Sequence, residues 1–212
     1  MTDFSVKRAR MVERQLRGRG IEDERVLAAM GRVPRERFVP RRSRHRAYDD
    51  SALEIGAEQT ISQPWIVAAI CQALDLRGDE HVLEVGTGSG YSAAVLALLA
   101  AEVIGIERHE SLALGAAKAL AEIGADNVEV LVGDGSRGYP ERAPYEAIAV
   151  HAAAPSPPPT LLAQLAEGGR LVVPVTVRVG EELIVLRRSG AAITREAIAP
   201  CRFVPLIGEE GF

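Results

Sequence analysis

Beyond Gly78 the chain alternates short apolar runs with stretches of helical character, and this alternation constrains the fold more than any other feature. Five runs have the length and composition of buried strands: residues 81–85, 103–107, 128–132, 145–150 and 170–175. Helices are expected between them, at about 90–100, 110–123 and 158–166. Strands that alternate with helices form a mostly parallel sheet covered on both faces, so we predict a doubly wound α/β fold.

The two ends of the chain depart from this alternation. Runs 182–188 and 201–206 follow without a helix between them, separated by the turn Ser189-Gly190, and are expected to be antiparallel C-terminal strands of a seven-stranded sheet. Ahead of Gly78 we expect two short helices around a glycine turn within 4–30, the second begun by Glu22 or Asp23. Irregular chain should follow from 33 to 56, and then a helix from Pro64 to about Leu74. The prediction is one domain over 1–212, with a helical N-terminal addition (1–77) and an α/β core with C-terminal strands (78–212).

Composition excludes several classes of protein. Of the 212 residues, 47% are hydrophobic and 25% charged, the balance of a folded globular protein. The longest apolar stretch, 91–101, falls short of the roughly 20 residues of a membrane-spanning helix. Charges near the N-terminus occupy the place of a signal peptide's apolar region, and Cys71 and Cys201 lack metal-type spacing. We therefore expect a cytoplasmic protein without a membrane segment or a metal site.

Charge is distributed unevenly along the chain. Residues 1–46 hold 14 Lys or Arg against 6 Asp or Glu, whereas residues 47–212 hold 11 against 23. A basic segment is the electrostatic footprint of nucleic-acid binding, but no aromatic interleaving and no nucleic-acid motif accompanies this one. Docking on the acidic body or on anionic peptides is favoured instead. A non-catalytic nucleic-acid-binding module is a third hypothesis for the function of the chain.

A glycine-rich turn follows the first strand of the alternating region. In VLEVGTGSGY, residues 82–91, Gly86, Gly88 and Gly90 let the backbone approach a ligand closely, and the helix that follows offers free N–H groups. The dinucleotide fingerprint G-x-G-x-x-G would need glycine at position 91, where Tyr91 stands. Glu84, just before the turn, would repel a pyrophosphate and favours a cationic ligand.

Two more carboxylates end the next strands. Glu107 ends the second strand, where it can accept both hydroxyls of a ribose, and Asp134 in the GDG of 133–135 can accept from an adenine amino group. Either residue alone could be a turn or cap residue. Together with Glu84 and the turn, they indicate a nucleoside that carries a positive charge, and we expect S-adenosyl-L-methionine, with S-adenosyl-L-homocysteine as its product.

The sequence resembles the protein-L-isoaspartate O-methyltransferase family over nearly its whole length. The resemblance is carried by MVERQLRGRGI, VPRERFVP, AYDDSALEIGAEQTISQPWIVA, VLEVGTGSGYSAAVLA, GDGSRGYPERAPYEAIAVHAAAP, LLAQLAEGGRLVVPV and CRFVPLIG. The glycine turn is shared with most class I methyltransferases, whereas the QTIS-x-P block and the FVPL end are more specific. The resemblance implies that Ser62 lies beside the methyl-accepting carboxylate and that Gln59, Thr60 and Ile61 border the cofactor, as do the turn and Gly135. Without it, Ser62 would be read as a helix cap or turn residue.

The reaction that the resemblance implies needs few catalytic side chains. Family members methylate the α-carboxylate of L-isoaspartyl residues in damaged proteins, and the ester collapses to a succinimide that can reopen to aspartate. A carboxylate with an ordinary pKa of about 3.5 to 4 is already ionised at pH 7, so no general base is needed. The expected partners are isoaspartyl proteins or peptides, and the expected state is a monomer. His151 would serve packing or a structural hydrogen bond rather than catalysis.

Several positions depart from the family's usual pattern. Glu58 stands where the family commonly has glycine, and Ala52 and Glu54 stand where it has proline. Trp65, Glu146 and Thr176 also differ from the usual residues. A carboxylate near an anionic acceptor would repel it unless it points away. These departures leave a second reading open, a carboxyl methyltransferase of the same fold that acts on another peptide or a small carboxylic acid.

Overall fold

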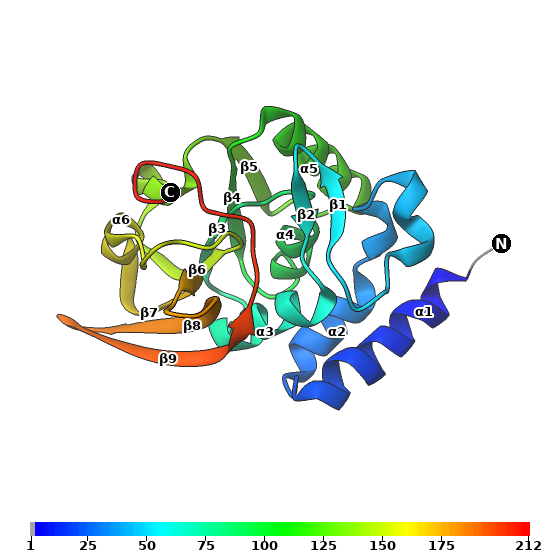
Figure 1. Cartoon of the computed structure of the whole chain (residues 1–212), viewed down its shortest axis with the longest axis horizontal. Coiled ribbons are helices and arrows are strands. Elements are labelled where there is room, and N and C mark those ends of the chain that lie inside the picture. The colour runs from blue at the N-terminus through cyan, green and yellow to red at the C-terminus, as the bar shows by residue number, and fades with distance from the viewer. Residues whose placement is uncertain (1–2) are drawn as a thin grey trace.

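Seven strands form one twisted sheet in the order β5-β4-β3-β6-β7-β8-β9 (Figure 1). The structure is a computed structural model and describes residues 3–212. The strands are β3 (His81–Val85), β4 (Glu102–Glu107), β5 (Val128–Val132), β6 (Tyr145–Val150), β7 (Leu165–Thr176), β8 (Glu181–Ser189) and β9 (Ala192–Cys201). Pairing is parallel from β5 through β7 and antiparallel from β7 through β9. The predicted doubly wound, mostly parallel sheet with antiparallel C-terminal strands is confirmed.

Alternate residues of the central strands pack into two apolar clusters, one on each face of the sheet. In β3, Val82 joins one cluster and Leu83 joins the other, because successive side chains of a strand point to opposite faces. Helices α3 (Pro64–Leu74), α4 (Tyr91–Leu96) and α5 (Glu110–Ile123) contribute to the first cluster, and α6 (Pro159–Ala163) to the second. Burial on both faces explains why these strands are continuous apolar runs.

The N-terminal addition is helical, as predicted, and packs beside the sheet. Helix α1 (Phe4–Met11) continues through a π-turn and a 3-10 turn to Arg19, and Gly20 ends it at φ +88°. Helix α2 (Glu24–Arg32) begins after Asp23, whose carboxylate accepts from the backbone N–H groups of Arg25 and Val26. Of the two starting residues that the sequence offered, Asp23 is therefore the cap. Among residues 3–212, no helix combines the length and the apolar character needed to cross a membrane.

Two local predictions are wrong. The expected irregular chain of 33–56 contains two 3-10 turns and strand β1 (Leu53–Gly56), which pairs with β2 (Gln59–Ile61) in an antiparallel hairpin. The last strand is β9 at 192–201, and not the run 201–206. Strand β9 directly follows the Ser189-Gly190 turn and pairs with β8 from Ser189↔Ala192 onward. Its side chains are mostly exposed, so it lacks the apolar pattern that would have revealed it.

Two helices are shorter than expected. Helix α4 ends at Leu96 rather than near 100, and α6 ends at Ala163 rather than near 166. The strand after α6 begins at Leu165, five residues earlier than its apolar run, and pairs there with Tyr145 across an irregular register. Pairing with β6 therefore sets the boundary that the apolar pattern alone placed too late.

Candidate active site

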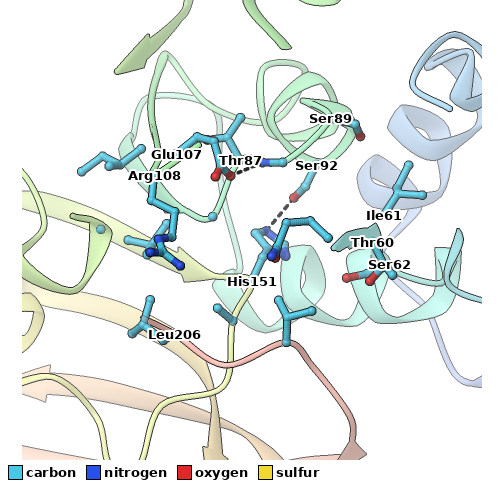
Figure 2. Close-up of a pocket in the computed structure, with 18 of the residues that line it drawn as sticks. Thr60, Ile61, Ser62, Thr87, Ser89, Ser92, Glu107, Arg108, His151 and Leu206 are labelled. Carbon is cyan, nitrogen blue, oxygen red and sulfur yellow. Dashed lines mark hydrogen bonds between the residues drawn. The ribbon is translucent and has the colours of Figure 1, made fainter. Parts of the chain in front are cut away.

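A pocket lies at the carboxyl ends of β3, β4 and β6, the edge where parallel sheets commonly bind ligands (Figure 2). Its walls come from the β1–β2 hairpin, the glycine turn, the end of β4, the residues after β6 and the C-terminal segment. The predicted residues among its lining are Gln59, Thr60, Ile61, Ser62, Gly86, Gly88, Glu107 and Gly135. The structure thus brings most of the predicted site together, whereas Glu84, Gly90 and Asp134 lie outside the lining.

The glycine turn is hydrogen-bonded to β4, because the backbone N–H groups of Gly86 and Thr87 both donate to the carbonyl of Ile106. The three glycines have φ values of +84°, +56° and +86° at positions 86, 88 and 90, in the left-handed region that favours glycine. Gly90 does not line the pocket; a Cβ there would lie 3.1 Å from Cβ of Ala116. Gly90 therefore lets α4 begin directly against α5, and the turn takes its shape from that packing.

Glu107 is oriented by two backbone N–H groups. Its Oε2 accepts from the N–H of Gly88 over 2.9 Å (Figure 2), and its Oε1 accepts from the N–H of His109 over 2.9 Å. A carboxylate has about four acceptor positions, so two remain for a ligand. Glu107 is 5% exposed and still lines the pocket. It is therefore a fixed acceptor suited to neighbouring hydroxyl groups.

Glu84 is a fully buried carboxylate beside the pocket. Its exposure is 0%, and within residues 3–212 neither of its oxygens has a hydrogen-bond partner. Nε2 of His151 lies 3.4 Å from Oε1 of Glu84. An unsatisfied buried carboxylate is costly, and a cation in the adjoining pocket would offset that cost.

Asp134 serves as a cap and a tether. Its Oδ1 accepts from the backbone N–H and the hydroxyl of Ser136, over 2.9 and 2.7 Å, and its Oδ2 accepts from the N–H of Glu209 over 2.8 Å. These hydrogen bonds hold the pKa of Asp134 below its ordinary value, although burial by itself raises the pKa. Asp134 thus anchors the C-terminal tail, while its neighbour Gly135 reaches the pocket.

The C-terminal segment 204–207 lines the pocket where a strand was expected. The backbone of Ala153 donates to the carbonyl of Val204 over 2.8 Å, and that of Leu206 donates to Ala153 over 2.7 Å. In Figure 1 this red segment leaves β9 and runs back past the sheet toward α6. The FVPL motif therefore acts as a wall of the site.

Ser62 follows the hairpin and precedes α3. The N-cap of α3 is Gln63, and no side-chain hydrogen bond caps that helix, so the capping interpretation of Ser62 is not supported. The backbone carbonyl of Ser62 accepts from Nη2 of Arg35 over 2.7 Å. Arg35, which the sequence did not single out, is 0% exposed and also donates from Nε to the carbonyl of Ala47 over 2.8 Å.

A second hollow, here called the groove, adjoins the pocket. It is lined by Arg19 and Ala52, by the segment 199–204 and by Ser62, Gln63, Trp65 and Ile66, and it shares Thr60, Ser62, His151 and Val204 with the pocket. Its lining contains two arginines, Arg19 and Arg202, and no Asp or Glu. The pocket thus has Glu107 and Arg108 in its wall and the buried Glu84 behind it, whereas the groove has arginines and no carboxylate.

The departures from the family pattern fall in different places. Ala52 and Trp65 line the groove, and the indole N–H of Trp65 donates to the carbonyl of Arg19 over 3.1 Å. Glu58 lies exposed at the hairpin turn with φ +59°. Glu146 accepts from the backbone N–H of His81, outside both hollows. Of these four departures, Ala52 and Trp65 line the groove, where a ligand would meet them.

Several lining residues were missed or given little weight. Arg108 follows Glu107 directly, and Ser92 lies in the first turn of α4, where its hydroxyl is 2.8 Å from Nε2 of His151. A polar residue directly after a strand or a glycine turn was the available signal for both. No sequence signal places 204–207 or Arg35 at this site, because long-range contacts bring them there.

Comparison with known proteins gives one consistent result. The family model described as protein-L-isoaspartate(D-aspartate) O-methyltransferase matches residues 7–211. The chain is 55% identical to protein-L-isoaspartate O-methyltransferase 1 of Rhodopseudomonas palustris strain HaA2, over 100% of this chain and 87% of that protein. Among solved structures, a protein-L-isoaspartate O-methyltransferase matches with TM-score 0.85 and 28% identity, covering 96% of this chain and 67% of that one.

A second solved structure supports the fold. It is a putative protein-L-isoaspartate O-methyltransferase from Plasmodium falciparum in complex with S-adenosyl-L-homocysteine, with TM-score 0.82 and 24% identity over 94% of this chain and 98% of that one. The match of the family model over nearly the whole chain, together with a relative of more than half identity, settles the classification. The chain belongs to the protein-L-isoaspartate(D-aspartate) O-methyltransferase family.

Proposed function

We propose that this protein transfers a methyl group from S-adenosyl-L-methionine to the α-carboxylate of L-isoaspartyl residues in damaged proteins, the first step of their repair through a succinimide. The observation that carries this proposal is the meeting, at Ser62, of a pocket that has carboxylates in and behind its wall with a groove that has arginines and no carboxylate. The pocket has Glu107 in its wall and the buried Glu84 behind it, and the groove has Arg19 and Arg202. A cationic cofactor and an anionic acceptor would each meet complementary charge.

The residues of the pocket fit this cofactor. Glu107 has two acceptor positions left for ribose hydroxyls, and the glycine turn leaves its backbone open to close approach. Gln59, Thr60 and Ile61 border the pocket, and Gly135 lies at its far wall. The buried, unsatisfied Glu84 favours a sulfonium or an ammonium nearby. When bound, S-adenosyl-L-methionine supplies an electrophilic methyl group. Asp134 is proposed to act on the adenine side, by placing Gly135 and the C-terminal tail.

The chain's own contribution to the reaction is positioning. The acceptor carboxylate is ionised at pH 7 with its ordinary pKa of about 3.5 to 4, so no side chain has to remove a proton. Holding two reactants in line can contribute about 7 to 11 kcal/mol. Ser62, which lines both hollows, is proposed to donate a hydrogen bond to the acceptor, with its backbone held by Arg35.

Two other functional hypotheses compete with isoaspartyl methylation. A carboxyl methyltransferase for a different peptide or small acid remains the alternative, since Ala52 and Trp65 change the groove. Family membership favours an enzyme over a non-catalytic nucleic-acid-binding module. We further propose a single-domain monomer in the cytoplasm, consistent with free Cys71 and Cys201; size-exclusion chromatography tests the monomer.

The decisive experiment uses an isoaspartyl peptide and its normal aspartyl twin with methyl-labelled S-adenosyl-L-methionine. Label should enter the isoaspartyl peptide alone; equal or absent labelling of the two contradicts the proposal. Ser62→Ala should lower kcat about 10-fold to 100-fold, the value of one hydrogen bond to a charged group. The rise in melting temperature with S-adenosylhomocysteine should stay unchanged. Unchanged turnover would remove Ser62 from the reaction.

A further inference from the structure

His151 occupies the boundary between the two hollows. It directly follows β6, and its backbone N–H donates to the carbonyl of Val85 over 2.8 Å. This hydrogen bond continues the pairing of β6 with β3, so the Cα of His151 is placed by the sheet itself. Cβ of His151 would lie 3.6 Å from a Cβ on Gly86. The residue is therefore set rigidly against the start of the glycine turn.

The imidazole ring is fixed at one edge. Nε2 lies 2.8 Å from Oγ of Ser92 (Figure 2) and 3.4 Å from Oε1 of Glu84. The side chain of His151 is 7% exposed, and Glu84 is 0% exposed. The hydrogen bond to Ser92 leaves the ring little freedom to rotate, because another orientation would leave the buried Ser92 hydroxyl unpaired.

The remaining exposed part of the ring borders both hollows. His151 lines the pocket and the groove, a property it shares with Thr60, Ser62 and Val204. A methyl group that passes from a ligand of the pocket to a ligand of the groove must cross the boundary that these four residues form. His151 is the member that comes from the central sheet, whereas Thr60 and Ser62 come from the hairpin side.

We propose that His151 is a positioning residue for methyl transfer, which acts together with Ser62 to set the distance and direction at which the acceptor carboxylate meets the methyl group. Ser92 serves this role by its hydrogen bond to Nε2, and Glu84 lies beside the same nitrogen. The chemistry requires no proton transfer to or from the acceptor, so the ring acts through geometry. This inference rests on the proposed function and adds a residue to the methyl-transfer boundary.

The test measures kcat and KM for the isoaspartyl peptide, and the Kd of S-adenosylhomocysteine, in His151→Ala, His151→Gln, His151→Asn and Ser92→Ala. For His151→Ala we expect kcat to fall about tenfold or more while the Kd changes less than about twofold. The glutamine amide can reach the place of Nε2 and should restore part of kcat, whereas the shorter asparagine should not. Ser92→Ala should lower kcat about threefold and add nothing to His151→Ala, because both act through the same ring.

His45 offers a matched control, because it is exposed and lies outside both hollows. His45→Ala should leave kcat and the Kd unchanged. Wild-type kcat in His151→Ala, a loss confined to the Kd, or additive effects of the Ser92 and His151 variants would each overturn the inference. If His151→Ala does not fold, Ser92→Ala decides alone through its kcat. Failure of the wild type to label the isoaspartyl peptide would instead overturn the proposed function.

Discussion

The guanidinium of Arg35 donates a hydrogen bond from Nη2 to the backbone carbonyl of Ser62, over 2.7 Å. Arg35 belongs to the N-terminal addition and is completely buried, with its guanidinium 4.7 Å from the centre of the Tyr91 ring. Within residues 3–212 no carboxylate lies at ion-pair distance from it. A charge buried on carbonyl oxygens and an aromatic ring is costly unless those contacts are kept. Arg35 therefore joins the N-terminal addition to the lip of the active site.

Arg35→Lys is expected to lower both stability and turnover. A lysine ammonium cannot reproduce the planar fork that reaches Ala47 and Ser62 together. One carbonyl is then left unpaired, which costs about 1–3 kcal/mol of unfolding free energy, and kcat should fall because Ser62 shifts. Urea unfolding and steady-state kinetics measure the two effects. Arg37→Lys, at an exposed neighbouring position, is the control and should change neither; equal behaviour of the two variants would contradict the prediction.

Glu58→Gly is expected to stabilise the protein. Glu58 has φ +59° in the tight turn between β1 and β2, and a left-handed conformation costs an ordinary residue about 1–2 kcal/mol. Part of that gain is offset by the flexibility of glycine when unfolded, so a rise of about 0.5–1 kcal/mol in unfolding free energy is expected. Glu58→Gln removes the charge but keeps the strain and should leave stability unchanged. A stabilised glutamine variant would show that charge, rather than backbone strain, is the cause. If Glu58 also repels the acceptor, both variants should lower the KM of the isoaspartyl peptide.

Gly90→Ala is expected to weaken cofactor binding. The added methyl group would lie 3.1 Å from Cβ of Ala116, and φ at this position is +86°, so α4 and the glycine turn must shift at a cost of about 1–3 kcal/mol. The Kd of S-adenosylhomocysteine, measured by calorimetry, should rise. Gly115→Ala is the matched control in α5, because no atom lies within 4 Å of its added Cβ. That variant should instead gain about 0.5–1 kcal/mol of stability. An unchanged Kd in Gly90→Ala would show that the turn tolerates the shift.

Glu80 is expected to make the stability of the folded protein depend on pH, with a loss in acid. Although burial raises its pKa, hydrogen bonds from the backbone N–H groups of Gly78 and Arg77 and the charge of Arg170 hold the pKa below its ordinary value. A carboxyl whose pKa is lower in the folded state stabilises the fold above its ordinary pKa of about 4.3 and loses that contribution as pH falls through the folded value. Glu80→Gln should therefore be less stable than the wild type at pH 7, and the difference in unfolding free energy should shrink below about pH 4.

The control for this prediction is Glu122→Gln, at an exposed position in α5. Its unfolding free energy should follow the wild type at every pH. A gap between wild type and Glu80→Gln that stays constant down to pH 2 would contradict the assignment, because it would mean that the lost stability does not depend on ionisation.

Most of the fold was predictable because its signals are local. The apolar runs that become β3, β4 and β6 are buried on both faces, so each is visible without knowledge of its neighbours. The turn at Gly86 to Gly90 and the start of α3 at Pro64 are likewise short-range signals. Strand β9 escaped prediction because its side chains are mostly exposed and its existence depends on pairing with β8.

The candidate site also combines residues that local motifs predicted with contacts that depend on the fold. Ser62, Gly86 and Gly88 were identified from motifs and Glu107 from its place at a strand end, and all four line the pocket. Asp134 was also identified, but the pattern could not say that its oxygens are taken by Ser136 and Glu209. Hydrogen bonds between residues far apart in the chain decide which carboxylates remain free for a ligand.

Periodicity, turn chemistry and strand boundaries are properties of adjacent residues, so the class of the fold, the glycine turn and the acids at the strand ends could be predicted from the sequence. The contact of Arg35 with Ser62, the contact of Ser92 with His151 and the closure of the pocket by residues 204–207 became visible only in the folded protein. Each of these contacts joins segments that are distant in the chain, and their geometry exists only after the sheet has brought those segments together.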